Sequence, residues 1–182
     1  HLVLGFEGLD YHDDDYHALL IYSAIMGAGG SSRLFQEIRE KRGLVYSIYA
    51  SAESFADSGT LQVVAGTGKN EIKELLPVLC DELINSPKNL TEKEIEKSKA
   101  QLKTSTLMSI ESTMTNATIA AYQLFRYGKL IDMQERIDKI NNVTKTSIEK
   151  VANKLLSSKP TISSIGPIKQ LESLDKIQNR LN

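Results

Sequence analysis

The stretch Gly27–Tyr49, GAGGSSRLFQEIREKRGLVYSIY, reads as a glycine turn, a short charged helix, a second glycine and an aromatic strand. The small residues at 27–30 let the backbone turn sharply, and Ser31 or Ser32 can cap the helix that follows. Gly43 stands where a helix end favours a left-handed residue, and β-type residues come after it. We call residues 27–49 the central segment and expect the rest of the chain to be arranged around it.

The predicted helix of the central segment has one apolar side and one charged side. Leu34, Phe35 and Ile38 fall at helical spacing and should face a core. The polar side is predicted to carry Arg33, Gln36, Glu37, Glu40 and Lys41.

The run from Gly29 to Ala50, GGSSRLFQEIREKRGLVYSIYA, closely resembles a segment in the C-terminal half of pitrilysin/insulysin-type zinc peptidases. Mitochondrial processing peptidase and its bacterial relatives belong to that family. The resemblance extends upstream through HLVLGFEGLDYHDDDYHALLIYSAIMG and downstream through ESTMTNATIAAYQLFRYGK and VTKTSIEKVANKLL. It implies a domain that lacks the zinc and completes an active site belonging to another domain.

The zinc motif of the family, H-x-x-E-H with a distant Glu, is absent from this sequence. The histidines are His1, His12 and His17, whereas such a site needs two histidines one helical turn apart. The run DYHDDDYH could hold a metal ion, but the aspartates at 13–15 are better interpreted as caps of the helix that runs toward Met26. We therefore expect no cofactor in this chain and a zinc ion in an N-terminal partner domain or subunit.

Size and composition fit a single domain over residues 1–182. The hydrophobic share of 41% is enough for a core, and the net charge of −1 gives no attraction to nucleic acid or to a membrane. The one cysteine, Cys80, lies on an apolar helix stripe and excludes an internal disulfide framework. Because His1 stands inside a predicted strand, we interpret the chain as a fragment, and the resemblance implies that it is the C-terminal half of a larger peptidase. The sequence does not identify the compartment, and we expect a soluble protein of the bacterial cytoplasm or an organelle matrix.

The first third of the chain is predicted to hold three strands. Leu2, Leu4 and Phe6 alternate with more polar residues, which indicates a strand with one buried face. Two β-type runs at 44–55 and 60–67 are joined by a turn-rich link, which predicts a hairpin.

From Asn70 onward the pattern is helical. An apolar stripe at 72–83 contains Pro77, which predicts a kink there or a helix that starts later. Thr91 and Glu94 form a capping box for a long helix. Polar residues at 107–116 should bend or break this helix. A further helix is expected at 117–127 and should stop at Gly128. Asp132 should start the next helix, and either Thr144 or Thr146 should start the last one. An extended run follows at 161–165, and residues after about 168 are expected to be a polar tail. The predicted fold class is α+β, a two-layer sandwich of a mainly antiparallel sheet with helices packed on one face.

The family resemblance assigns a catalytic role to Arg39 and Tyr46, which are expected to reach across to the zinc-bearing half. An arginine fork and a phenol can stabilise the developing oxyanion of peptide hydrolysis or hold an extended peptide backbone. Another interpretation stays open. Arg39 could be a solvated residue paired with nearby glutamates, and Tyr46 shares strand parity with Leu44 and Ile48, so it could belong to the core.

The glycine turn invites two functional interpretations. A glycine-rich loop before a helix can bind phosphate, but this loop lacks G-K-[ST] and G-x-G-x-x-G and follows a helix. The resemblance instead implies a flexible element that contacts peptide, with the substrate-binding residues Gly27, Gly29, Gly30, Ser31 and Ser32.

Two functions remain from the sequence. In the first, the chain is the substrate-binding half of a zinc endopeptidase that hydrolyses peptide bonds in proteins or peptides, and the chain alone is inactive. In the second, it is a structural module like the inactive core subunits of respiratory complexes. The expected partners are the zinc-bearing domain and a peptide substrate, with no nucleic acid and no membrane. We also expect the fragment to self-associate through the face that its missing half covers.

Overall fold

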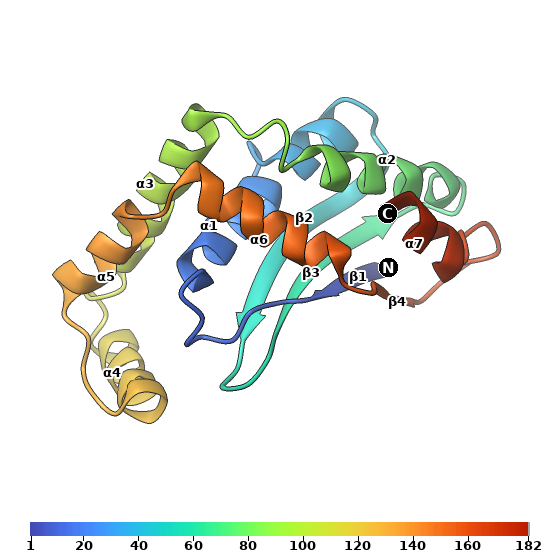
Figure 1. Ribbon diagram of the computed structural model, residues 1–182. Coiled ribbons are helices and arrows are strands. Elements are labelled where there is room, and N and C mark those ends of the chain that lie inside the picture. The colour runs from blue at the N-terminus through green and yellow to red at the C-terminus, as the bar shows by residue number, and fades with distance from the viewer. Residues whose placement is uncertain (182) are drawn as a thin grey trace.

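The structure, a computed structural model, describes residues 1–181 of the chain and contains one sheet with helices packed against it (Figure 1). In chain order the elements are β1 Leu2–Glu7, α1 Tyr16–Gly27, the π-helix η1 Phe35–Glu40, β2 Val45–Ser54, β3 Gly59–Thr67, α2 Ile72–Asn85, α3 Glu92–Met108, α4 Thr113–Tyr127, α5 Met133–Asn141, α6 Lys145–Ser157, β4 Thr161–Ser164 and α7 Leu174–Leu181. Among these residues no helix combines the length and the apolar character of a membrane span.

The sheet has four strands in the order β2-β3-β1-β4, and every neighbouring pair is antiparallel. β2 and β3 form the predicted hairpin. The alternation in β1 is confirmed, because Leu2, Leu4 and Phe6 are buried while Glu7 is exposed. The predicted α+β class is therefore confirmed.

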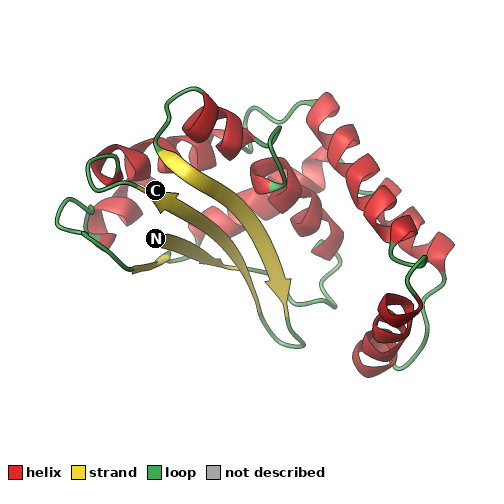
Figure 2. Ribbon diagram, turned by 180° about the vertical axis from the view of Figure 1, so that it is seen from behind, coloured by secondary structure: helices red, strands yellow, loops and turns green. Residues whose placement is uncertain are grey.

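The helices cover one face of the sheet, and Figure 2 shows the other face with no helix over it. α1 packs on β2, and α6 packs on α1 and β1. On the open face Tyr49 and Glu53 are exposed and Val64 is half-buried. The apolar side chains of the sheet therefore point into one layer of helices, and the core lies between the two layers.

The end of α1 approaches β2 so closely that only glycine fits at position 27. A Cβ atom on Gly27 would lie 1.8 Å from the backbone nitrogen of Ala50. This contact fixes where β2 crosses α1, and it therefore sets the position of the whole central segment.

Most boundaries of the helical half follow the sequence signals. Both hydrogen bonds of the Thr91–Glu94 capping box are present, and Gly128 has the left-handed φ of +67° that ends α4. Of the two candidate starts for α6, Thr144 is the cap, and it forms a box with Ser147. α4 begins four residues before the predicted start, at Thr113.

Of the two alternatives predicted for Pro77, a kink or a later helix start, the later start is wrong. The helix runs from Ile72 to Asn85 with Pro77 inside it. The carbonyl of Lys73 loses its intrahelical donor at Pro77, and Lys73 is exposed, so water can replace the missing bond. Cys80 is buried as predicted, and burial raises the pKa of its thiol to about 11.

The polar tail expected after residue 168 contains a helix, α7, that packs on α2. Ile177 and Leu181 are buried there, one turn apart, Leu174 is half-buried, and the other positions are polar. These three apolar residues have helical spacing, but eight residues are a short window for this pattern, and the sequence analysis missed the helix.

The aspartates before α1 are not the helix caps that the sequence predicts. Asp15 precedes α1 without a capping hydrogen bond from its side chain, and Asp13 accepts a bond of 2.8 Å from the backbone nitrogen of Asp15. Both carboxylates also form ion pairs with α6: Asp15 lies 2.7 Å from Lys150, and Asp13 lies 3.6 Å from Lys154. They therefore shape the turn and hold α6 against α1.

Candidate functional site

The charged helix of the central segment is a π-helix over most of its length. The backbone nitrogen of Lys41 donates to the carbonyl of Gln36, five residues back, at 3.0 Å. The predicted serine cap is absent, because the Ser32 hydroxyl donates instead to the carbonyl of Gly29 at 2.8 Å. Single π-turns are frequent at functional sites because they redirect the side chains that follow.

The apolar side of this helix and the glycine that ends it are as predicted. Leu34 and Ile38 are fully buried and Phe35 is half-buried against the core. Gly43 has a φ of +63°, and the backbone nitrogen of Leu44 then donates to the carbonyl of Ile38 at 3.0 Å. The chain therefore turns back at once, which brings the end of η1 beside the start of β2.

A β-bulge at the start of β2 turns Tyr46 outward. Val45 pairs with Thr67 and Ser47 pairs with Gly66, so Tyr46 is the extra residue without a partner in β3. Its side chain is 80% exposed, although Val45 and Ile48 are buried. The interpretation of Tyr46 as a core residue was therefore wrong, because the bulge breaks the period-2 alternation on which it rested.

Arg39 is exposed, and the neighbouring glutamate that could neutralise it is engaged elsewhere. Glu37 binds Lys41 at 2.5 Å and Arg42 at 3.2 Å. Within residues 1–181 no carboxylate forms an ion pair with Arg39, whose guanidinium lies 4.7 Å from the centre of the Phe35 ring. Of the alternative kept open for Arg39, the solvent exposure agrees with the structure, but the pairing with nearby glutamates does not. The fork of Arg39 is therefore free to bind a ligand.

Arg39 and Tyr46 line the same open hollow, which has a volume of about 390 Å³ and which we call the Arg39 hollow. Its other lining residues are Glu40, Gly43, Leu44, Val45, Gly68 and Glu71. A guanidinium, a phenol and two carboxylates that line one hollow can together donate hydrogen bonds to the backbone of an extended peptide and accept hydrogen bonds from it. Glu71 was not predicted to belong to this site, because it follows β3 in the chain and the β2–β3 hairpin brings it to the hollow.

The five predicted substrate-binding residues fall into two groups. Gly27 and Ser32 are buried, whereas Gly29, Gly30 and Ser31 are exposed. None of the five lines the Arg39 hollow. The Gln36 side chain donates to the carbonyl of Gly30 at 2.5 Å, and Lys97 donates to the Ser31 hydroxyl, so the turn is tied to η1 and α3.

Arg33 connects the central segment to α3, a role that its place on the predicted polar face did not indicate. Its guanidinium binds both carboxylate oxygens of Glu94 and also the carbonyl of Asn89, at 2.7 Å. Burial raises the pKa of Glu94, but hydrogen bonds from Arg33 and Thr91 outweigh burial and hold this pKa at about 2. Glu94 is therefore ionised at neutral pH and keeps Arg33 in place.

A metal site is not formed by the part of the chain that the structure describes. Among residues 1–181 no group of three or more His, Cys, Asp or Glu side chains is arranged to hold a metal ion. In the DYHDDDYH run, the His12 ring instead packs against the rings of Tyr11 and Tyr127.

Residues 1–102 match the family model described as "Peptidase M16 inactive domain". Over 183 residues the chain is 34% identical to an uncharacterized zinc protease of Streptomyces coelicolor, a match that covers 100% of this chain and 39% of that protein. It is 33% identical to an uncharacterized zinc protease of Bacillus subtilis, covering 92% of this chain and 41% of that one. The mitochondrial-processing peptidase subunit alpha of Caenorhabditis elegans is 28% identical, over 96% of this chain and 36% of the relative. The chain thus spans about two fifths of the length of these relatives.

Solved structures of other proteins include domains with the same fold as this chain. A chain of Complex III2 from Candida albicans, with Inz-5 bound, superposes with a TM-score of 0.86 at 17% identity, covering 99% of this chain and 46% of that one. A conserved protein from Enterococcus faecalis V583 gives a TM-score of 0.73 at 27% identity, covering 84% and 36% respectively.

Proposed function

Because the chain belongs to the M16 peptidase family through its match to that family's inactive domain, we propose that it completes the active site of a zinc endopeptidase. In this family the zinc site lies in the other domain. The reaction is the hydrolysis of peptide bonds in proteins or peptides. The zinc-bearing domain or subunit supplies the metal and the activated water, and this chain supplies donors for the substrate.

The observation that carries the proposal is that Arg39 and Tyr46 are both exposed and line the same hollow. Exposing the Tyr46 ring contributes nothing to the core, and a guanidinium without a carboxylate partner contributes little to stability. Arg39 contacts the Phe35 ring but forms no ion pair among residues 1–181. Two exposed donors that line one hollow, presented by a π-helix and a bulge, fit a role toward a ligand.

Each donor has a separate role in the proposal. The Tyr46 hydroxyl donates to the carbonyl oxygen on which negative charge develops, a contact that is strongest in the transition state. The planar fork of Arg39 holds a backbone carbonyl of the substrate. Glu40 and Glu71 also line this hollow and can accept hydrogen bonds from N–H groups of that backbone.

The exposed part of the glycine turn is proposed to contact the peptide beyond this hollow. Gly29, Gly30 and Ser31 are accessible and present backbone groups at the surface. Gly27 and Ser32 are buried, so they act by fixing the shape of the turn, through the Ala50 contact and the bond to Gly29 respectively.

The test is steady-state kinetics in the protein that contains the zinc-bearing domain. Tyr46→Phe removes one hydroxyl, and Tyr49→Phe is the matched control, because Tyr49 is a 48% exposed tyrosine on the same strand outside the hollow. The proposal requires kcat to fall roughly a hundredfold for Tyr46→Phe, the usual effect of losing one oxyanion donor, and to stay unchanged for Tyr49→Phe. Equal activity of the two variants would contradict it.

The alternative of a purely structural module has no observation in its favour. The likeness to the Complex III2 chain, at 17% identity, concerns the fold alone. A structural module would also have no use for two exposed donors around one hollow.

A further inference from the structure

A second hollow, of about 270 Å³, lies between α1, α3, α4 and α5, and we call it the α4 hollow. It shares no lining residue with the Arg39 hollow. Figure 1 places α4 and α5 at one end of the molecule, with α2 and α7 at the other. Its lining residues are Tyr16, His17, Leu20, Leu102, Thr106, Ile119, Tyr122, Gln123, Arg126, Tyr127, Ile131, Arg136, Lys139 and Ile140.

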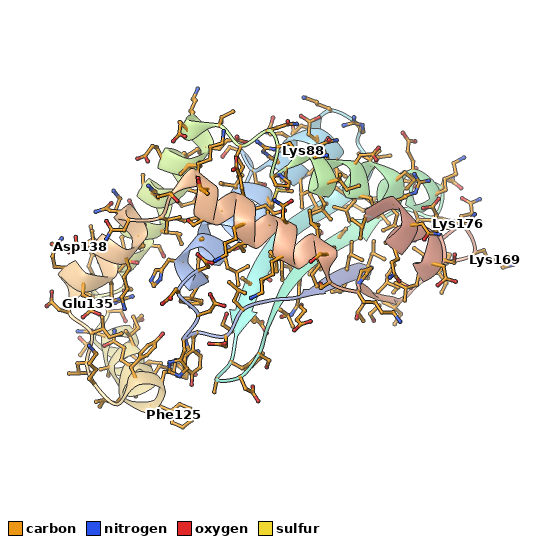
Figure 3. The ribbon with its side chains drawn as sticks, in the orientation of Figure 1. Lys88, Phe125, Glu135, Asp138, Lys169 and Lys176 are labelled. Atoms are coloured by element: carbon orange, nitrogen blue, oxygen red, sulfur yellow. The ribbon has the colours of Figure 1, made fainter. Side chains whose placement is uncertain are left out.

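The charges around the α4 hollow have one sign. Three cationic side chains line it, those of Arg126, Arg136 and Lys139, and no carboxylate does. Lys139 binds Glu135 at 3.1 Å, and Figure 3 shows Glu135 on the outer side of α5. Within residues 1–181 neither arginine forms an ion pair, so two guanidinium groups face the hollow without an anion.

Neighbouring side chains hold these donors in place. The Arg126 guanidinium lies between two aromatic rings, 4.9 Å from the centre of Tyr11 and 5.3 Å from that of Tyr122. The Gln123 side-chain oxygen accepts a hydrogen bond of 3.0 Å from the backbone nitrogen of Ile131, which leaves the amide N–H groups for a ligand. Pre-positioned donors bind a ligand with less loss of conformational freedom.

The environment of the hollow also changes the pKa of His17, which is one of the lining residues. Burial, with Lys139 and Arg136 nearby, lowers the pKa of His17 to about 4, so the imidazole is neutral at neutral pH. Burial is the larger cause and disfavours a charge of either sign, whereas the part that comes from Lys139 and Arg136 reflects the positive side chains that line the hollow.

We propose that the α4 hollow binds a small organic anion, a single carboxylate on a short apolar or aromatic body. The guanidinium fork matches the geometry of a carboxylate. Aliphatic side chains of Leu20, Leu102, Ile119, Ile131 and Ile140 form the remaining wall and cover the body of the ligand. A volume just below the usual 300–1,000 Å³ of small-molecule sites keeps that body short.

The ligand would also join α4 to the rest of the fold. α4 has no buried residue, yet it supplies Ile119, Tyr122, Gln123 and Arg126 to one wall of the hollow. The other lining residues come from α1, α3 and α5 and from Ile131. Filling the space between them therefore buries apolar surface of α4, and the backbone amides of α4 should then exchange more slowly with deuterium.

The test is calorimetric titration of the purified protein with 3-phenylpropionate. Its uncharged analogue 3-phenylpropionamide and the bare anions acetate and phosphate are the comparison ligands. The proposal expects saturable binding of 3-phenylpropionate at one site, much weaker binding of the other three, and slower exchange in α4 only with 3-phenylpropionate. Arg136→Gln should raise Kd by about tenfold or more, and Arg136→Lys should raise it less.

Arg39→Gln is the matched control, because it removes an exposed arginine without an ion pair from the other hollow and should leave this Kd unchanged. Melting curves of each variant verify folding, and Arg126→Gln replaces Arg136→Gln if that variant is unfolded. Absence of saturable binding at about 10 mM would overturn the proposal, as would equal binding of the amide, the acetate or the phosphate. Because the readout is binding and exchange, its failure is separate from a failure of the peptidase role.

Discussion

The guanidinium of Arg33 donates from Nε and Nη2 to the two carboxylate oxygens of Glu94, at 2.5 and 2.8 Å. The two residues are 61 positions apart, and Glu94 also closes the capping box at the start of α3. One carboxylate therefore both starts a helix and holds the central segment against it.

Replacing Glu94 with Gln should lower the free energy of unfolding by about 2 kcal/mol, because a bidentate charge-assisted contact becomes a neutral one. Gln can still close the capping box, so the effect isolates the contact with Arg33. Urea unfolding at neutral pH measures it. Glu96→Gln is the control, because Glu96 is mainly exposed and should contribute less than about 0.5 kcal/mol. A similar loss in both variants would contradict a special role for Glu94.

The Arg33–Glu94 contact should also weaken in acid. The pKa of Glu94 is about 2 in the fold, whereas the ordinary pKa of a glutamate is 4.5, so the contribution of this contact to stability is fully present above pH 4.5. As pH falls from 4.5 toward 2, the unfolded chain binds a proton first and this contribution is lost. The melting temperatures of the parent protein and Glu94→Gln should therefore converge across that range, whereas a constant difference would exclude the linkage.

His17 should make the protein less stable at mildly acidic pH. Its pKa falls from 6.5 to about 4 on folding, so below pH 6.5 the unfolded chain takes up a proton that the native state does not. Stability is therefore lost as pH falls from 6.5 to 4. In His17→Gln the melting temperature should depend less on pH across this window, and an unchanged profile would show that His17 does not titrate as described.

Arg39→Lys should separate geometry from charge in the zinc-bearing protein. If the fork of Arg39 holds a substrate carbonyl, lysine keeps the charge but loses the second donor, and kcat/KM should fall about tenfold. Arg42→Lys is a control on the same segment, because Arg42 is paired with Glu37. Parent-like kinetics of Arg39→Lys, with Arg39→Gln strongly impaired, would show that only the charge matters.

Gly27→Ala should destabilise the fold by about 3 kcal/mol or more, because the added methyl group overlaps the backbone at Ala50. Gly29→Ala is less informative about packing, since nothing lies within 4 Å there, but its φ of +81° still disfavours a side chain. Thermal unfolding of both variants should therefore show the larger loss at position 27. The reverse order would contradict the close approach of α1 and β2.

The self-association that we predict for the chain should depend on the outer side of α4. Phe125 is 85% exposed and Met114 77% exposed, and Figure 3 shows Phe125 at the outer end of the helix. Exposed apolar groups of this kind favour association. Sedimentation velocity should show weaker association for Phe125→Ser than for the control Lys88→Ser. A parent protein that is monomeric at all concentrations would remove the basis of this prediction.

Local patterns in the sequence determined much of the fold. The alternation of Leu2, Leu4 and Phe6, the Thr91–Glu94 box and Gly43 each depend on residues that are close in sequence, and each was predicted correctly. Local hydrogen bonding and side-chain periodicity suffice for such features. The resemblance of the central segment to a known family was also visible in the sequence, and Arg39 and Tyr46 were identified as candidate site residues from it.

The tertiary structure alone decided how these two residues are presented. The bulge that exposes Tyr46 depends on how β2 pairs with Thr67 and Gly66, some twenty positions away. For Arg39, the tertiary structure brought Gly68 and Glu71, which are distant in sequence, to the same hollow. The pairing of Glu37 with Lys41 and Arg42, four and five residues further on, is local by contrast. Strand register and such long-range contacts are set by the three-dimensional arrangement of the whole segment, because many pairings of similar energy are open to an isolated chain.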